Sequence, residues 1–141
     1  MDWQLERRVA ALEEHRRLAE AVGWVDAFDW RTMRASLDAS LFGVVAVAGH
    51  DVVGMGRLVG DGVKYFYVQD VAVDPAWQGR GIGQAIIDVM MAWVADTAPS
   101  AAFVGVFATE VAMPLYRRAG FGTEGLRGMA RLIDPAGGQL S

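Results

Sequence analysis

The 141-residue sequence contains no cysteine and only two histidines. The lack of cysteine excludes disulfide bonds, thiolate metal ligands and catalysis through a cysteine nucleophile. His15 and His50 have no companion ligands at metal-binding spacing, so we predict no metal site. We expect both histidines to be structural, one on a helix face and one in a hairpin turn.

The sequence also lacks a long apolar run and a strong charge of one sign. No segment reaches the roughly 18 consecutive apolar residues that a membrane-spanning helix needs. Residues 1–8 are charged where a signal peptide would be apolar. The net charge of −4, with both signs interspersed, argues against nucleic acid and is compatible with a cationic small molecule. We therefore expect a cytoplasmic protein without nucleic-acid or membrane partners.

The sequence does contain enough hydrophobic residues to form a core. Hydrophobic residues make up 53% and charged residues 21%, which predicts one globular domain over residues 1–141. Gly23 is expected to end the first helix, and Asp26 or Asp29 to begin the second. The predicted elements are a weak strand 3–9, helices 11–22 and 30–40, strands 43–48, 52–59 and 65–74, helix 84–95, strand 101–107, helix 110–119 and a weak strand 126–133. This alternation predicts an α+β or α/β fold.

A glycine-rich loop separates strand 65–74 from helix 84–95. It reads Gln78-Gly79-Arg80-Gly81-Ile82-Gly83. Alternate glycines let the backbone approach a ligand closely, and the free N–H groups of the following helix favour phosphate. The loop lacks the full dinucleotide spacing and is not followed by Gly-Lys-Ser or Gly-Lys-Thr. By itself it fits a phosphate site and an ordinary tight turn equally well.

A second motif, Leu115-Tyr116-Arg117-Arg118-Ala119-Gly120-Phe121, follows downstream. With the glycine loop and the preceding Val73-Asp74-Pro75, it resembles the GNAT superfamily of N-acetyltransferases over nearly the whole chain. The resemblance implies a mixed, mostly antiparallel central sheet of six to seven strands, flanked by about four helices. It also implies central strands that splay apart at the cofactor site, and homodimers are common among such relatives.

The resemblance further implies acetyl-coenzyme A as the acyl donor, with its pyrophosphate on the loop amides and its pantetheine arm paired with the strand before the loop. The implied cofactor-binding residues are Val71, Ala72, Val73, Gln78, Gly79, Arg80, Gly81, Ile82, Gly83, Gln84 and Thr109. Thr109 departs from the asparagine that many relatives carry. Its hydroxyl either replaces part of that contact or caps the next helix.

Tyr116 is the catalytic residue that the resemblance implies. A tyrosine with an ordinary pKa near 10 is protonated at neutral pH, so it can protonate a departing thiolate. The alternative is a packed aromatic at a helix end. The base that deprotonates the amine stays unassigned among Asp70, Glu110 and water. Strand alternation puts Asp70 on the face opposite Val71 and Val73, where a buried carboxylate bonded to backbone is an equal alternative.

The acceptor implied by the family is a primary amine, acetylated directly without a covalent enzyme intermediate. We predict a small, aromatic or otherwise partly apolar amine, because aromatic and acidic residues gather in the expected acceptor region. The alternatives are a protein or peptide amine and a non-catalytic, coenzyme A-binding regulatory module. The aromatic residues either line the acceptor pocket or fill the core; they are Trp24, Phe28, Trp30, Tyr65 and Tyr67.

Overall fold

The computed structural model of this chain describes residues 2–136 and the backbone of residues 138–140. It contains two compact units, Met1–Val106 and Phe107–Ser141. Among the helices of the described residues, none combines the length and apolarity required to cross a bilayer.

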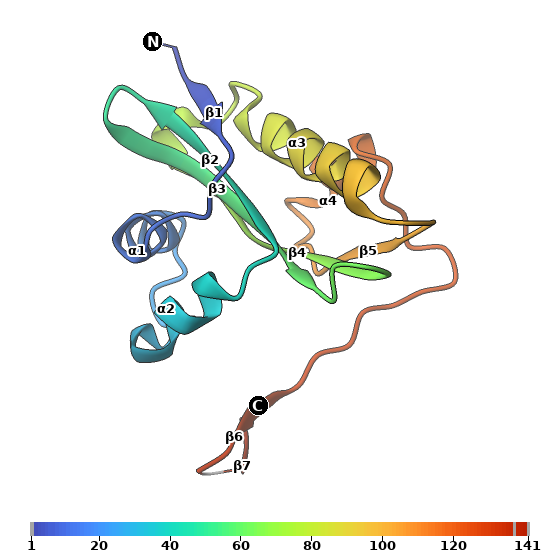
Figure 1. The fold of residues 1–141 in the computed structure, drawn as a ribbon. Coiled ribbons are helices and arrows are strands. Elements are labelled where there is room, and N and C mark those ends of the chain that lie inside the picture. Colours follow the sequence, from blue (N-terminus) through green and yellow to red (C-terminus); the bar gives the residue numbers. More distant parts are fainter. Residues whose placement is uncertain (1, 137, 141) are drawn as a thin grey trace. The chain divides into compact units, whose positions relative to one another are not determined.

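The first unit is built on a five-stranded sheet in the order β1-β2-β3-β4-β5 (Figure 1). Its strands are β1 (Gln4–Glu6), β2 (Phe42–Ala48), β3 (Asp51–Gly60), β4 (Tyr65–Val73) and β5 (Phe103–Val106). The first four pair antiparallel, whereas β4 and β5 pair parallel. Short turns join β2 to β3 and β3 to β4, but both helices of the N-terminal part lie between β1 and β2. The parallel pair requires a long crossover, which the helix α3 (Ile82–Thr97) supplies.

Close packing between α3 and the sheet depends on two glycines of β3. A Cβ at Gly54 would lie 2.9 Å from Ile82, and one at Gly56 would lie 2.8 Å from Ile86. Ile82 and Ile86 are buried against this face. The glycines therefore let the helix that follows the loop approach β3 and β4.

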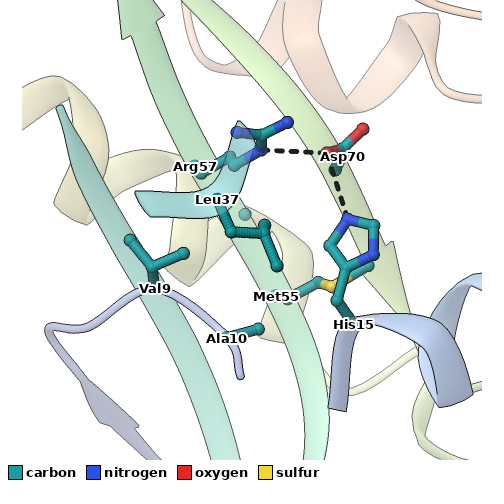
Figure 2. A pocket seen from close by; sticks show the side chains of 8 residues that line it. Val9, Ala10, His15, Leu37, Met55, Arg57 and Asp70 are labelled. Atoms are coloured by element: carbon teal, nitrogen blue, oxygen red, sulfur yellow. Dashed lines mark hydrogen bonds and ion pairs between the residues drawn. The ribbon is translucent and has the colours of Figure 1, made fainter. Parts of the chain in front are cut away.

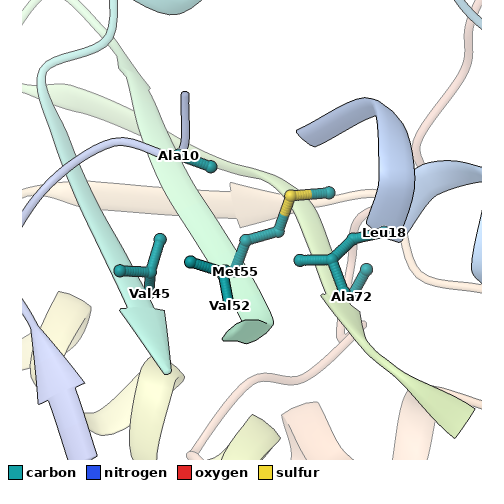
Figure 3. Close-up of a cluster of buried hydrophobic side chains, with 6 residues drawn as sticks. All are labelled: Ala10, Leu18, Val45, Val52, Met55 and Ala72. Carbon is teal, nitrogen blue, oxygen red and sulfur yellow. The ribbon is translucent and has the colours of Figure 1, made fainter. Parts of the chain in front are cut away.

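The opposite face of the sheet packs against α1 (Leu12–Ala21). Figure 3 shows the buried cluster that joins them. Leu18 of α1 meets Met55 of β3 and Ala72 of β4, and all three are 5% exposed or less. The neighbouring helix is α2 (Trp30–Asp38), and it contacts α1.

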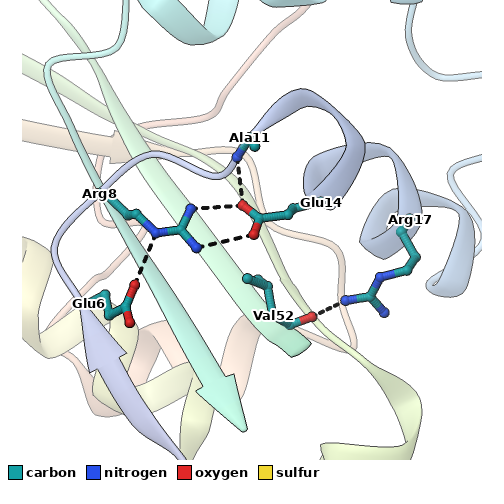
Figure 4. Close-up of polar contacts among 6 residues, drawn as sticks. All are labelled: Glu6, Arg8, Ala11, Glu14, Arg17 and Val52. Carbon is teal, nitrogen blue, oxygen red and sulfur yellow. Dashed lines mark hydrogen bonds and ion pairs between the residues drawn. The ribbon is translucent and has the colours of Figure 1, made fainter. Parts of the chain in front are cut away.

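Polar contacts fix the first helix to the sheet (Figure 4). The guanidinium of Arg8 donates two hydrogen bonds to Glu14, at 2.8 and 3.1 Å. Glu14 also accepts the Ala11 N–H at 2.8 Å, which satisfies an amide at the helix start. Arg17 donates to the carbonyl of Val52 on β3. Gly23 ends the helix in a left-handed conformation (φ +92°), as the sequence predicts.

Of the two candidates for the start of α2, the structure selects Asp29. Its carboxylate accepts the Arg31 N–H at 3.0 Å, whereas Asp26 lies earlier in the connecting loop. The helix ends at Asp38, two residues before the predicted boundary.

The second unit contains α4 (Met113–Arg118) and a two-stranded sheet, β6 (Leu132–Asp134) with β7 (Gly138–Leu140). The strand predicted over 126–133 is wrong for most of its length, since only its last two residues are in a strand. Gly125, just before the predicted strand, has φ +73°, and a side chain at Gly128 would lie within 2.4 Å of the Phe107 ring. The main sheet accordingly has five strands instead of the predicted six to seven.

Candidate active site

β4 extends beyond the end of β5, which pairs with it along the whole of its own length. Their ladder runs from Tyr65–Phe103 to Val68–Val106 and ends there. β4 continues to Val73, and over these last residues its described partner is β3. Among the described strands, none pairs with this last part of β4 on the edge opposite β3, and such an edge can accept an extended ligand. The predicted splay of two central strands stays a prediction.

The register identifies which main-chain groups face that edge. The Asp74 N–H donates to the Val53 carbonyl at 2.8 Å, toward β3. Neighbouring residues of an antiparallel pair direct their amide groups to opposite sides. Val73 thus directs its groups away from β3, and Ala72 directs its groups toward it. The alternation does not extend to Val71, because the β3–β4 register shifts between Ala72 and Gln69. The side chain of Ala72 is also buried in the core cluster.

The loop after β4 is held against the end of that strand. A short 3-10 turn, η1 (Pro75–Trp77), begins with Asp74, whose carboxylate accepts the Ala76 N–H at 2.9 Å. The side-chain amide of Gln78 then donates to the Val73 carbonyl at 3.0 Å. Gln78 therefore holds the loop against β4, and its side-chain amide nitrogen is used in doing so.

Two loop glycines adopt backbone conformations that side-chain-bearing residues avoid. Gly79 has φ +79° and Gly81 has φ +81°, and a Cβ at either would meet no atom within 4 Å. Gly81 is the N-cap of α3, which makes the helix begin two residues before the predicted Gln84. The open space above these glycines leaves room for a ligand against the backbone.

The first turn of α3 presents unpaired amides to that space. The first hydrogen bond of the helix runs from the Ala85 N–H to the Gly81 carbonyl, at 3.0 Å. The amides of Ile82, Gly83 and Gln84 come before it and therefore have no acceptor within the helix. The first turn contains no acidic residue. Arg80 stacks its guanidinium 4.5 Å from the centre of the Trp77 ring, which adds a positive charge beside the loop. The arrangement is suited to binding a phosphate group.

A buried ionic cluster lies on the α1 side of β4, and sequence reasoning missed it. Figure 2 shows Asp70 between Arg57 of β3 and His15 of α1. Asp70 accepts a hydrogen bond from Arg57 Nε at 2.9 Å and one from His15 Nε2 at 3.1 Å. Arg57 also donates to the Ser36 carbonyl at 2.9 Å and to the Ser40 hydroxyl at 3.1 Å. The partners come from distant parts of the chain, so no local pattern marks them.

These contacts determine the pKa of the Asp70 carboxyl group. Burial raises the pKa of its carboxyl, but the hydrogen bond from His15 and the charge of Arg57 outweigh burial and hold the pKa below its usual value. Asp70 faces away from Val71, as predicted, because Val71 lies on the α3 side beside Gly56. The alternative of a carboxylate bonded to backbone is wrong, since the carboxylate accepts its hydrogen bonds from the side chains of His15 and Arg57. A carboxylate with a lowered pKa and both partners in place is a weak base.

The lowered pKa of Asp70 makes a prediction for stability against pH. An unfolded aspartate has a pKa of about 3.9, so the stabilisation from Asp70 is complete above about pH 5 and is lost as the pH falls through the lower, folded pKa. The difference in unfolding free energy between wild type and Asp70→Asn should therefore be large at pH 7 and shrink below about pH 4. Urea titrations across pH 3–7 measure it, and a pH-independent difference would contradict the assignment.

The aromatic residues predicted for the acceptor region separate into two groups. Phe28 and Trp30 pack edge-on against the His15 ring, with centroids 5.0 and 5.7 Å away, and Trp24 lies beside Phe28. Tyr65 and Tyr67 instead contact Phe103 of β5. All five retain solvent exposure, so none is a fully buried core residue.

In the second unit, Tyr116 lies on α4 and is 7% exposed. Its ring meets Phe121 edge-on at 5.6 Å. Burial raises the pKa of the Tyr116 hydroxyl to about 12, so it carries its proton throughout the physiological range. The Thr109 hydroxyl accepts the Ala112 N–H at 3.3 Å in the turn before α4, whose N-cap is Ala112, so both of its predicted roles stay predictions. Glu110 is exposed.

Residues 7–121 match the family model described as the acetyltransferase (GNAT) family. The chain belongs to this family. The match crosses the boundary between the two units and includes the free edge of β4, the glycine loop and α4.

Relatives of this GNAT chain include a solved GNAT-family acetyltransferase from Streptococcus pneumoniae. It is 30% identical with a TM-score of 0.79, over 95% of this chain and 99% of that one. An uncharacterised N-acetyltransferase from Prochlorococcus marinus is 32% identical, over 63% of this chain and 51% of the relative. A histone acetyltransferase from Glycine max is 31% identical, over 55% and 34% respectively. The chain thus spans about half or less of these two relatives' length.

Proposed function

We propose that this GNAT chain transfers the acetyl group of acetyl-coenzyme A directly to a primary amine, most readily that of a small, partly apolar molecule. The observation that supports it best is the free edge of β4 leading into a phosphate-type loop within a family match over residues 7–121. Because that match includes both compact units, we propose that they act together as one acetyltransferase domain.

The residues present fit the donor substrate. The amides of Ile82, Gly83 and Gln84, with the backbone of Gly79 and Gly81, would bind the pyrophosphate, and Arg80 would add charge. Each hydrogen bond to a charged group contributes about 1.5–3 kcal/mol, so a few such bonds support micromolar binding. The main chain of residues 71–73 would pair with the amide groups of the pantetheine arm. Ala72 supports these contacts by packing its side chain in the core cluster. Gln78 supports them by donating a hydrogen bond to the Val73 carbonyl.

The reaction balances without an enzyme nucleophile. The amine nitrogen attacks the thioester carbonyl, a C–N bond forms, and the C–S bond breaks. Tyr116, which its raised pKa keeps protonated, donates a hydrogen bond to the developing thiolate and passes it a proton as the C–S bond breaks. The proton of the amine leaves to water or Glu110, because Asp70 is engaged by Arg57 and His15.

The acceptor proposal rests on the connection between α1 and α2. Trp24, Phe28 and Trp30 are half-buried there, and Asp26 is exposed in the same segment. Aromatic faces with a nearby carboxylate attract a cationic amine through cation–π contact and charge pairing. Asp29, by contrast, is already engaged by Arg31 at 2.9 Å.

The glycine loop gives a direct test of donor binding. Gly81→Val places a branched side chain in the open space above the loop, and we expect it to raise the Kd of acetyl-coenzyme A at least about tenfold through lost phosphate hydrogen bonds. Calorimetric titration measures this Kd.

The control is Gly23→Val at the end of α1. Gly23 also has a positive φ and open space around it, so the backbone strain is comparable, but it is remote from the loop in sequence. Kd should match wild type in this control. Equal Kd values for wild type and Gly81→Val would remove the phosphate-loop assignment.

A further inference from the structure

The strand β4 contains a bulge at the point where it leaves β5. Met55 pairs with Ala72 and Arg57 with Gln69, so two steps along β3 correspond to three along β4. Asp70 and Val71 therefore lie opposite the single residue Gly56. The ladder with β5 ends at Val68, two positions before the bulge.

Asp70 adopts a backbone conformation that is unfavourable for its residue type. Its φ is +56°, and among the described residues it is the one non-glycine with a positive φ. Such a conformation persists when surrounding contacts determine it, and it is common at functional sites. Bulges re-aim the strand that carries them.

The contacts that determine this conformation are the ionic cluster. His15 and Arg57 hold the Asp70 carboxylate from two elements, and both are 7% exposed or less. Arg57 is fixed in turn by the Ser36 carbonyl and the Ser40 hydroxyl. Gly56 has no Cβ, so Val71 can pack opposite it, 3.2 Å from where that Cβ would be.

We propose that His15 and Arg57 are positioning residues, which hold Asp70 in its left-handed conformation and thereby orient the Val71–Val73 main chain for the acyl donor. Asp70 acts here through its backbone and is not the general base. This inference rests on the proposed function, because it concerns binding of acetyl-coenzyme A. It links α1, which carries His15, to the donor edge of β4.

Substitutions at Asp70 separate a backbone role from a proton-transfer role. Glycine adopts positive φ freely and asparagine tolerates it. For alanine, the equilibrium population of this conformation is lower by about five- to thirty-fold. We expect Kd for acetyl-coenzyme A to rise about five- to thirty-fold in Asp70→Ala relative to Asp70→Gly, with Asp70→Asn close to wild type. Both Ala and Gly remove the carboxylate, so they are matched for the loss of its ion pairs.

The kinetic pattern distinguishes the general-base alternative. A general base would lose kcat equally in the Asn, Gly and Ala variants, with the acidic limb of the pH–rate profile abolished and KM unchanged. A positioning role instead changes KM for acetyl-coenzyme A more than kcat. The general-base pattern would overturn the inference.

A second variant keeps the test decisive if Asp70→Ala does not fold. His15→Phe retains a ring among Phe28 and Trp30 but loses the hydrogen bond to Asp70. It should raise Kd for acetyl-coenzyme A, while His50→Phe, in an exposed hairpin turn, should not. If wild type binds acetyl-coenzyme A and the Ala, Gly and His15 variants all bind it equally well, the inference fails alone. If wild type binds none, the proposed function fails with it.

Discussion

Replacing Tyr116 with phenylalanine is expected to lower kcat for acetyl transfer by about 10²–10⁴-fold, the range for loss of a general acid. The ring is retained, so its contact with Phe121 persists and the Kd of acetyl-coenzyme A should not change. Steady-state thiol release gives kcat, and calorimetry gives Kd.

The pH dependence adds a second readout for Tyr116. Since its pKa is raised to about 12, the hydroxyl stays protonated across the usual assay range. The loss of kcat in Tyr116→Phe should therefore be similar from pH 6 to 9, and wild type should show no decline there from ionisation of this tyrosine. An unchanged kcat in a folded Tyr116→Phe protein would end the general-acid assignment.

Replacing Arg57 with methionine is expected to lower the free energy of unfolding by about 3–5 kcal/mol, because it leaves a buried carboxylate with an incomplete set of partners. Arg57 is 7% exposed and joins β3 to Asp70 and to the C-terminal part of α2. The substitution removes the charge pair with Asp70 and leaves the Ser36 carbonyl without this donor. Urea unfolding at pH 7 measures the change.

The matched control is Arg34→Met on the surface of α2. Its side chain is 68% exposed, with Glu13 at 3.9 Å. Exposed ion pairs of this kind contribute about 0–1 kcal/mol, so this variant should unfold close to wild type. Similar losses in both variants would show that the buried cluster has no special weight in stability.

The sequence predicts those parts of the fold that local physical chemistry determines. The hairpin of β2 and β3 is confirmed. Two β-branched runs and the Gly49-His50-Asp51 connection between them predict it. Asp29 caps α2 through its own following amide, which is a local contact. The glycine loop is also local, since Gly79 and Gly81 adopt conformations that favour glycine.

The parts that sequence reasoning missed depend on contacts between distant residues. The positive φ of Asp70 is held by His15 and Arg57, neither of which is near it in the chain. His15 lies on a buried helix face, as predicted, but its partner Asp70 could not be read from a helical pattern. The strand predicted over 126–133 is absent except at its last two residues, because a strand also needs a partner strand, which alternation of apolar residues does not reveal.

The most direct test of the central claim measures thiol release from acetyl-coenzyme A with a panel of acceptors. The panel contains aromatic amines, polyamines, amino sugars, amino acids and a lysine peptide, and calorimetric binding of acetyl-coenzyme A is measured alongside. We predict donor binding and thiol release that depends on a small amine, with the highest kcat/KM for an aromatic one. Turnover with the lysine peptide alone would assign a protein or peptide acceptor, and binding without turnover by any amine would favour a regulatory module. Absence of acetyl-coenzyme A binding would contradict the account as a whole.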